Sequence, residues 1–245
     1  MSMDRVADRI VVQRSDPLAG EVVVPGAKNS VLKLMVASLY ATGRHELTNV
    51  PDISDVETMG ALLGALGVRV NRDPDDDSIL HLVNDGNVRT VAPPDLVTSI
   101  RASINLLGPL LAVAGTVRLD MPGGDDFGSR PIDMHVAGLE AMGVVFRIDE
   151  QSIVANASRL HGADITLDFP SVGATENLVT AAVHADGVTR IVNAAREPEV
   201  ADLCDLLVEM GARIEGIGTS TLTVEGVERG SLRPVSHAVV TDRIQ

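Results

Sequence analysis

Aromatic residues are nearly absent from this sequence of 245 residues, which contains no Trp, one Tyr and three Phe. Apolar residues nevertheless make up 45% of the chain, which is enough to bury a core and excludes an intrinsically disordered protein. The core is therefore expected to be aliphatic, built from Val, Leu, Ile, Ala and Met. A chain of this length forms one large domain or two modest ones.

Cysteine is equally scarce, because Cys204 is the only one, and a single Cys excludes an internal disulfide. The Cys and His residues do not have the spacing of a metal site, so no metal is expected. Cys204 follows Val200 and Leu203 and precedes Leu207 at helical spacing. This pattern predicts a buried core position for Cys204 rather than a reactive thiol.

Long apolar runs are missing too. The longest, residues 104–115, is too short to span a bilayer and is interrupted by Gly108 and Pro109. The first residues, Met-Ser-Met-Asp-Arg-Val, do not have the pattern of a signal peptide. These features predict a cytoplasmic chain that does not associate with membranes.

Basic residues are outnumbered, and the formal net charge is -14. A surface this acidic excludes general binding to nucleic acid or to anionic membranes, so an anionic small ligand would need a local basic cluster. Lys28 and Lys33 are the only lysines. Lys28 stands at a predicted helix start, where the helix dipole disfavours a cation, which favours a functional role over a solvated surface lysine.

A unit of about 70 residues occurs three times, and such a period fixes the architecture before any local pattern is considered. Each unit opens with a helix start followed by an apolar run that ends at a Gly. The three openings are Pro25-Gly26-Ala27-Lys28-Asn29-Ser30, Thr98-Ser99-Ile100-Arg101-Ala102-Ser103 and Pro170-Ser171-Val172-Gly173-Ala174-Thr175. Equivalent helix N-termini would gather in one region, where their unpaired N–H groups favour anions.

Within each unit the periodicity predicts helix, strand, helix, strand, strand. The first helices are expected at residues 29–42, about 100–114 and about 173–186. Short strands are expected before them, at Glu21–Val24, Thr90–Ala92 and Ile165–Asp168. Three α/β units of this kind can close around a pseudo-threefold axis with the apolar first helices inside.

The second unit carries an additional loop, residues 122–131, which holds three glycines and two prolines. Such loops often carry chemistry because a rigid scaffold positions them, although a long turn without function is the alternative. Asp125 lies in this loop, and its carboxyl group can donate or accept a proton in general acid–base catalysis.

These motifs resemble those of the UDP-N-acetylglucosamine 1-carboxyvinyltransferase family, within the EPSP synthase-like superfamily. Six matches occur in order and cover nearly the whole chain: Gly26-Ala27-Lys28-Asn29, Arg101-Ala102-Ser103-Ile104, Pro122-Gly123-Gly124, Gly128-Ser129-Arg130-Pro131-Ile132-Asp133-Met134-His135, Ser171-Val172-Gly173-Ala174-Thr175 and Asn193-Ala194-Ala195-Arg196-Glu197-Pro198-Glu199. Together they form a strong signal, whereas each alone would be weak.

The resemblance implies two domains, each an inside-out α/β barrel of three units, with the substrates in the cleft between them. Residues 26–232 would be the first domain, in units of about 26–89, 90–160 and 161–232. Residues 1–25 would contain a strand of the second domain, and residues 233–245 would begin the crossover to it. The family chain is longer, so the second domain would be missing from this sequence or supplied by a separate chain.

The implied reaction transfers the enolpyruvyl group of phosphoenolpyruvate to the 3'-hydroxyl of UDP-N-acetylglucosamine, in peptidoglycan precursor synthesis, with no metal or organic cofactor. The implied catalytic residues are Lys28, Arg101, Asp125 and Arg130. The implied substrate-binding residues are Lys28, Asn29, Arg101, Arg130, Pro131, Ile132, Asp133, Met134, His135, Ser171, Val172 and Gly173. Arginine and lysine suit a trianionic ligand and a leaving phosphate.

One departure concerns the loop, where the family usually has Cys and this sequence has Asp125. A carboxylate does not readily form the thioether made by the antibiotic fosfomycin, so resistance to that drug is expected. Glu197 and Glu199 precede and begin a predicted helix, where capping explains them as well as a site role does.

Three functions remain open at this point. The chain is the first half of an enolpyruvyl transferase, a non-catalytic UDP-sugar-binding fragment or degenerate gene product, or a relative that acts on shikimate 3-phosphate. The short length favours the second, the retained basic residues favour the first, and the Arg130–His135 segment disfavours the third.

Overall fold

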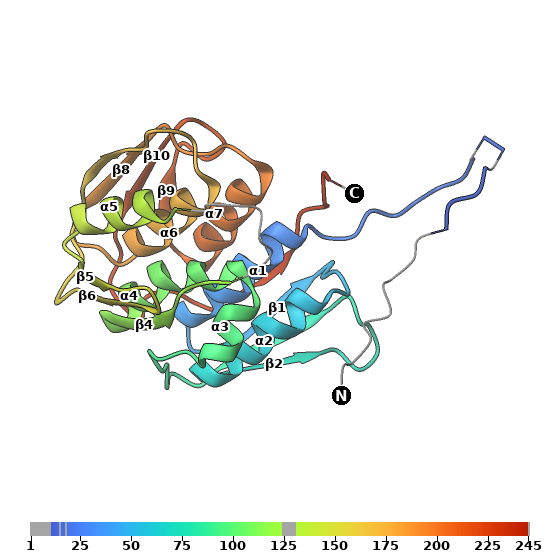
Figure 1. The fold of residues 1–245 in the computed structure, drawn as a ribbon, viewed down its shortest axis with the longest axis horizontal. Coiled ribbons are helices and arrows are strands. Elements are labelled where there is room, and N and C mark those ends of the chain that lie inside the picture. Colours follow the sequence, from blue (N-terminus) through green and yellow to red (C-terminus); the bar gives the residue numbers. More distant parts are fainter. Residues whose placement is uncertain (1–10, 15, 18, 124–130, 245) are drawn as a thin grey trace.

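The computed structural model describes residues 11–14, 16–17, 19–123 and 131–244, and these form three α/β units (Figure 1). The first unit contains α1 Lys28–Ala37, η1 Ser38–Tyr40, β1 Gly43–Thr48, α2 Ser54–Leu66, β2 Val68–Arg72 and β3 Leu80–Asn84. The second contains α3 Pro94–Ser99, η2 Arg101–Leu106, α4 Leu107–Ala114, β4 Thr116–Asp120, α5 Asp133–Ala141, β5 Val145–Ile148 and β6 Ser152–Asn156. The third contains β7 Asp164–Thr166, α6 Val172–Ala182, β8 Val188–Val192, α7 Pro198–Met210, β9 Arg213–Glu215 and β10 Thr221–Glu225, and β11 Ser236–Ala238 follows it.

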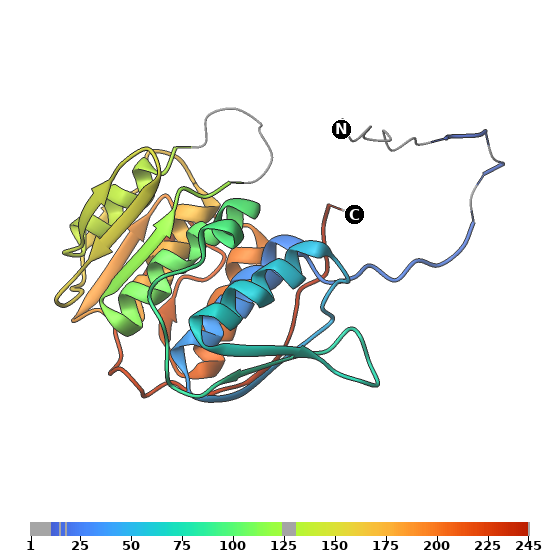
Figure 2. The same ribbon diagram turned by 60° about the horizontal axis from the view of Figure 1, so that its bottom comes forward.

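The first helices of the three units form the centre of the domain, as predicted. Residues 107–112 of α4 are all buried, and so are residues 174–182 of α6. The sheets lie around these helices (Figure 2). The core is aliphatic, as the scarcity of aromatics requires, and its largest fully buried side chains are Leu and Met.

Each unit has its own sheet, in the orders β11-β1-β3-β2, β4-β6-β5 and β7-β8-β10-β9. In every sheet the strand after the first helix pairs antiparallel with the last strand of its unit, as in β1 with β3. On its other side the same strand has a parallel partner: β11 for β1, β7 for β8, and a single bridge from Val91 to Arg118 of β4. The three units therefore share one topology, and the fold class is α/β.

Two of the strands predicted before the first helices are wrong. Residues 21–24 form no strand, because β11 from the far end of the chain occupies the place beside β1. Thr90–Ala92 is reduced to the bridge at Val91. The strand predicted at Ile165–Asp168 is confirmed, shifted to Asp164–Thr166.

The predicted helix at about 100–114 is divided into η2 and α4, and α3 precedes it unpredicted. Pro94 at the first position of α3 suits a helix start, since its missing N–H would be unpaired there. At Ile100 the backbone turns extended and separates α3 from η2.

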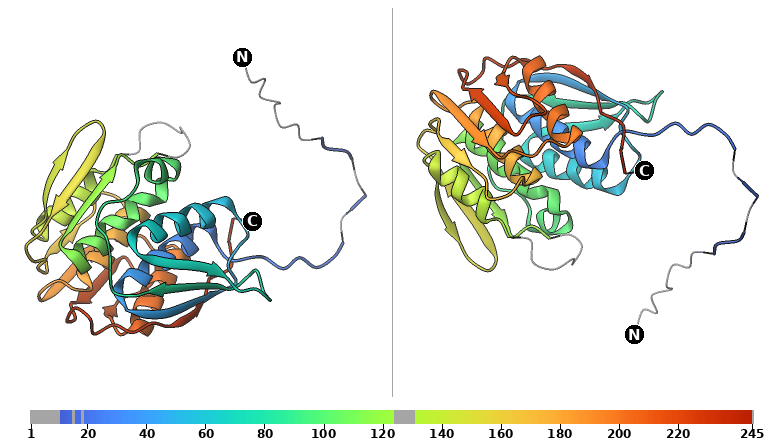
Figure 3. Two further views of the ribbon diagram at one scale, coloured as in Figure 1. Left: turned by 90° about the horizontal axis from the view of Figure 1, so that it is seen from below. Right: turned by 90° about the horizontal axis from the view of Figure 1, so that it is seen from above.

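The two ends of the domain lie side by side. The Ala27 N–H donates to the Val240 carbonyl at 2.7 Å, and the Asp242 N–H donates to Pro25 at 2.9 Å. The preceding chain leads away from the domain (Figure 3), and Val22 and Val23 are both 85% exposed. No helix in the described ranges combines the length and the apolar character needed to cross a membrane.

Candidate functional site

A cleft of about 620 Å³ opens where the first helices of the three units begin. Seven of the predicted site residues line it: Lys28, Asn29, Arg101, His135, Ser171, Val172 and Gly173. They come from the starts of α1, η2 and α6 and from α5. The repeat thus brings equivalent helix starts together, as the sequence predicted.

The start of α1 is held in place by its neighbours in the fold. A side chain at Gly26 would collide with the Asn49 carbonyl oxygen, so only Gly allows the chain to pass there. The Lys28 N–H faces Asp242 Oδ2 at 3.4 Å. The C-terminal segment therefore fixes the turn that presents Lys28 and Asn29.

The ammonium group of Lys28 is the first positive charge of the cleft. Its Nζ lies 3.0 Å from Asp55 Oδ1 at the start of α2, and its side chain is 51% exposed. An ion pair exposed in this way contributes little energy, on the order of 0–1 kcal/mol, and so exchanges readily for a ligand. Lys28 can therefore turn its ammonium toward an anion in the cleft.

Arg101, at the start of η2, carries the second cation. Its Nη1 donates to the Pro122 carbonyl at 3.2 Å. Pro122 is the first residue of the predicted catalytic loop, so Arg101 links the cleft to the root of that loop. Asp125 and Arg130 lie outside the described residues, and their roles remain predictions.

His135 is a neutral imidazole at the wall of the cleft. Burial and, to a smaller extent, the nearby positive charge of Arg101 lower its pKa to about 4, against the opposing effect of Asp133. Asn177 Nδ2 donates to His135 Nδ1 at 2.9 Å, which assigns the ring proton to Nε2. His135 thus offers the cleft an N–H donor without a charge.

Asn177 is fully buried on α6 and sets this arrangement. Its Nδ2 also donates to the Ile104 carbonyl at 3.2 Å, and its Oδ1 accepts the Gly108 N–H at 2.9 Å. These contacts fix which way the amide points. The N-terminus of α6 is capped by Ser171, whose Oγ accepts the Ala174 N–H at 3.3 Å.

The remaining members of the predicted segment before His135 do not line the cleft. Pro131 and Asp133 are exposed, and Ile132 and Met134 are partly exposed. They lie at the start of α5, on the approach to His135. Among the described residues of that segment, only His135 reaches the cleft wall.

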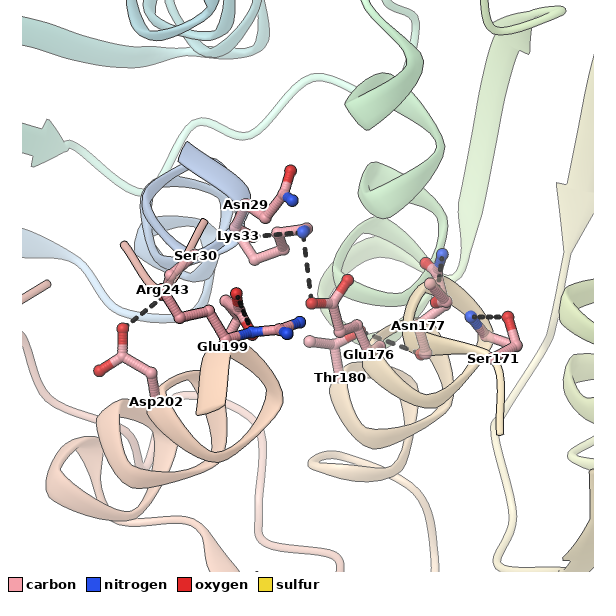
Figure 4. Close-up of polar contacts among 12 residues, drawn as sticks. Asn29, Ser30, Lys33, Ser171, Glu176, Asn177, Thr180, Glu199, Asp202 and Arg243 are labelled. Carbon is pink, nitrogen blue, oxygen red and sulfur yellow. Dashed lines mark hydrogen bonds and ion pairs between the residues drawn. The ribbon is translucent and has the colours of Figure 1, made fainter. Parts of the chain in front are cut away.

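Sequence reasoning missed an ion pair on the cleft floor. Lys33 Nζ of α1 lies 3.3 Å from Glu176 Oε1 of α6, and the side chains are 10% and 1% exposed (Figure 4). The available signals were that Lys33 is the only lysine besides Lys28, and that Glu176 is the only charged residue of α6. Neither signal shows that the two residues meet.

Glu197 and Glu199 also line the cleft, so capping alone does not describe them. Glu197 is the N-cap residue of α7 but makes no side-chain cap. Glu199 is 4% exposed and accepts from Arg243 Nε at 3.1 Å (Figure 4). Arg243 was not predicted as a site residue and adds another cation to the lining.

Cys204 lies in the core, as predicted, and burial raises the pKa of its thiol to about 12. A thiol in this state is not a nucleophile near neutral pH. In the part of the chain that the structure describes, no three His, Cys, Asp or Glu side chains are grouped as a metal site would require. The chemistry of the described cleft is that of cations, a neutral imidazole and buried carboxyl groups.

Comparison with known proteins shows the family to which the chain belongs. The family model for EPSP synthase (3-phosphoshikimate 1-carboxyvinyltransferase) matches residues 12–245. Proteins named UDP-N-acetylglucosamine 1-carboxyvinyltransferase are 50% identical in Corynebacterium jeikeium, over 97% of this chain, and 50% identical in Nocardia farcinica, over 98%. In both cases the chain spans 56% of the relative's length.

Solved structures share the fold. The enolpyruvyl transferase NikO from Streptomyces tendae superposes with a TM-score of 0.78 at 25% identity, over 92% of this chain and 52% of that one. EPSP synthase from Acinetobacter baumannii superposes with a TM-score of 0.70 at 16% identity, over 91% and 50%, which supports the fold alone.

Proposed function

The chain belongs to the EPSP synthase family, and from this membership we propose that it is the first half of a UDP-N-acetylglucosamine 1-carboxyvinyltransferase. The reaction moves the enolpyruvyl group of phosphoenolpyruvate to the 3'-hydroxyl of UDP-N-acetylglucosamine and releases phosphate. The 50% identity to relatives of that name supports the choice of acceptor. The observation that carries the proposal is that Lys28, Arg101 and His135 line one cleft together with the start of α6.

Each of these groups has a physical task in such a reaction. Lys28 and Arg101 compensate the charge of phosphoenolpyruvate and of the departing phosphate, together with Arg130. The turn at Ser171, Val172 and Gly173 opens α6 and suits the diphosphate of the sugar nucleotide.

The remaining roles concern the acceptor and the proton. The neutral His135 donates a hydrogen bond without adding charge, and Asn29 contacts the reacting groups. Asp125 acts as the acid–base group in the loop. No metal or organic cofactor takes part in this scheme.

The proposal includes a second half that this sequence does not contain, because the chain spans about half the length of its curated relatives. The domain begins at residue 26 and includes β11, which pairs with β1; residues 1–25 contribute to the other half, and the residues after β11 lead toward it. The missing half, in the same polypeptide or a separate chain, supplies further groups around the acceptor hydroxyl. The product enters peptidoglycan synthesis in the cytoplasm, which links the protein to cell shape and division.

Ligand binding tests the proposal on the chain as it stands. Calorimetric titration should show binding of UDP-N-acetylglucosamine and of phosphoenolpyruvate. Lys28→Ala should weaken the binding of phosphoenolpyruvate at least about tenfold, because a charge-assisted contact is lost. Arg69→Ala is the matched control, since Arg69 pairs with Asp85 on the exposed surface. Preference for shikimate 3-phosphate would overturn the choice of acceptor. Phosphate release on adding the second half separates an enzyme from a binding fragment.

Fosfomycin provides a test of Asp125. The active protein, with its second half, should keep its phosphate release after incubation with the drug, because a carboxylate does not form the thioether. Asp125→Cys should make it sensitive. Inactivation of the unsubstituted protein would contradict the assignment.

A further inference from the structure

The Lys33–Glu176 pair lies in the cleft but has no place in the reaction described above. Lys33 is on the second turn of α1, after Lys28 and Asn29, and its Nζ also donates to the Asn29 carbonyl oxygen. Its side chain lines the same cleft as Lys28 and Arg101. The pair therefore lies within reach of a ligand held by these two cations.

Glu176 depends on Lys33 for its charge. The carboxylate is 1% exposed, and neither of its oxygens accepts a hydrogen bond of good geometry from any described residue. A buried carboxylate without hydrogen bonds is costly and is normally neutralised or paired. The ammonium of Lys33, 3.3 Å away, is the compensating group.

The other groups around Glu176 disfavour its ionised form. The start of α7 presents Glu197 and Glu199, whose negative charges repel a carboxylate, and Arg243 is committed to Glu199. Cys204 on α7 holds its proton. From η2, Asn105 lines the same cleft and a small adjoining gap, with its Oδ1 buried and unpartnered among the described residues.

Together these effects place the pKa of Glu176 close to physiological pH, so its carboxyl group is partly protonated there. Burial raises the pKa of Glu176, Lys33 lowers it and the repulsion from Glu199 and Glu197 raises it, and together these effects bring it to about 7. A change in the position of the Lys33 charge, or a new negative charge nearby, would raise the pKa of Glu176 further.

We propose that Lys33 is an additional phosphate-binding cation of this cleft, with Glu176 as its counter-ion in the absence of ligand. When a phosphorylated anion engages the ammonium of Lys33, the Glu176 carboxylate takes up one proton from solvent. No covalent bond changes, and the buffer is the source of the proton. This proposal rests on the proposed function, since it takes a phosphorylated anion to be the ligand of the cleft.

Calorimetry in two buffers of different ionisation enthalpy measures the proton directly. At pH 7.5, binding of phosphoenolpyruvate to the chain should take up a fraction of a proton, and the affinity should fall as pH rises from 7 to 8.5. Glu176→Gln keeps the shape of the side chain, removes the titrating group and leaves Lys33 uncompensated. This variant should bind several-fold more tightly, with no net proton uptake.

Lys33→Met removes the cation and should weaken the binding of phosphoenolpyruvate at least about tenfold. Because this change leaves a buried carboxylate unpaired and lowers stability, the Lys33→Met/Glu176→Gln double variant provides a second measurement with the same expected loss of affinity. Inorganic phosphate as the probe should show the same pattern, since it carries the charge without the enol.

The two proposals fail in different ways. Tight binding of phosphoenolpyruvate without proton uptake, or uptake that persists in Glu176→Gln, overturns the role of this pair and leaves the proposed function standing. Unchanged affinity in the double variant does the same. Absence of any binding of phosphoenolpyruvate and UDP-N-acetylglucosamine overturns both.

Discussion

The imidazole of His135 is buried against α6 and accepts a hydrogen bond at Nδ1 from Asn177, so the fold holds it in its neutral form. Its pKa is lowered to about 4, mainly by burial, whereas an unfolded histidine titrates near about 6.5. Above about pH 6.5 neither state binds the proton, and the full stability is present. As pH falls from about 6.5 toward 4, the unfolded chain takes up the proton first and stability is lost.

We therefore expect the free energy of unfolding to fall by up to about 3 kcal/mol over this range on account of His135. His45 and His184 are buried with lowered pKa values and add to the same loss, so the difference from His135→Gln isolates the contribution. Urea unfolding at pH 7 and pH 4.5 measures it. His161→Gln, at an exposed site, is the control, and an acid loss of equal size in His135→Gln would contradict the assignment.

His237 has the opposite dependence on pH. Its Nε2 lies 2.9 Å from Asp202 Oδ1 and its Nδ1 lies 2.9 Å from Glu209 Oε2. The hydrogen bond to Asp202 raises the pKa most, against the effect of burial, and with Glu209 brings it to about 9. The charged ring thus stabilises the folded state. This contribution to the free energy of unfolding is fully present below about pH 6.5 and is lost as pH rises through about 9.

The expected loss between pH 7 and pH 10 is about 1–2 kcal/mol, reduced from the full value because solvent screens part of the interaction. His237→Gln should be less stable at pH 7 and should lose this step. Thermal unfolding at pH 7, 8.5 and 10 follows it. A parallel alkaline decline in the variant and the unsubstituted chain would assign the step to another group.

At the scale of elements, α4 and α6 approach each other closely at Gly108. A side chain there would overlap Thr180 Oγ1 and the Asn177 carbonyl oxygen. Gly108→Ala should therefore lower the free energy of unfolding by about 1–3 kcal/mol or more, because the added methyl group would force the two helices apart and cost packing contacts. Denaturant titration of the two proteins provides the measurement.

Gly64 is the matched control for Gly108. It lies on the exposed side of α2 with open space around it, so Gly64→Ala should raise stability by about 0.5–1 kcal/mol through helix propensity. Equal effects of the two substitutions would mean that α4 and α6 do not pack as described.

Elements with a strong local signal were predictable from the sequence. The apolar run after Lys28 and the runs that end at Gly67 and Gly211 predict helices, and both glycines are left-handed caps. Strand β11 has no such signal, since it is three residues long and its partner lies far away, with Ser236 and Glu46 190 positions apart. Without a partner known in advance, three residues cannot be distinguished from a loop.

The candidate site divides in the same way. Lys28, Asn29 and Ser171 lie at helix starts, and the repeat places such starts together. The meeting of Lys33 with Glu176 depends on how α1 and α6 both pack against α7 and η2, which no local pattern encodes. Arg101 also belongs to the opening of a repeat unit, whereas family resemblance alone supplied His135, and the structure adds why His135 is neutral.

At the scale of the whole molecule, the chain closes its first sheet with its last strand. β11 pairs parallel with β1, where the Glu46 N–H donates to Val235 and the Val239 N–H donates to Thr48, both at 3.0 Å. Asp202 of α7 joins this closure by accepting from Ser30 Oγ and from the Val240 N–H. One segment thus ties the first unit to the third and fixes the turn that presents Lys28.

A chain that ends at residue 233 should therefore lose about 3 kcal/mol or more of stability, because it removes the parallel partner of β1, leaves a cavity in place of the buried Val239 and deprives Asp202 of His237 and Val240, so that Ser30 alone remains of these three partners. The open edge of β1 should also promote association. Urea midpoints, amide exchange at Glu46 and sedimentation measure these effects. A chain that begins at residue 20 is the control and should keep its stability, since Val11 and Val12 are exposed. If the C-terminal truncation unfolds at the same urea concentration as the intact chain, β11 does not hold the units together.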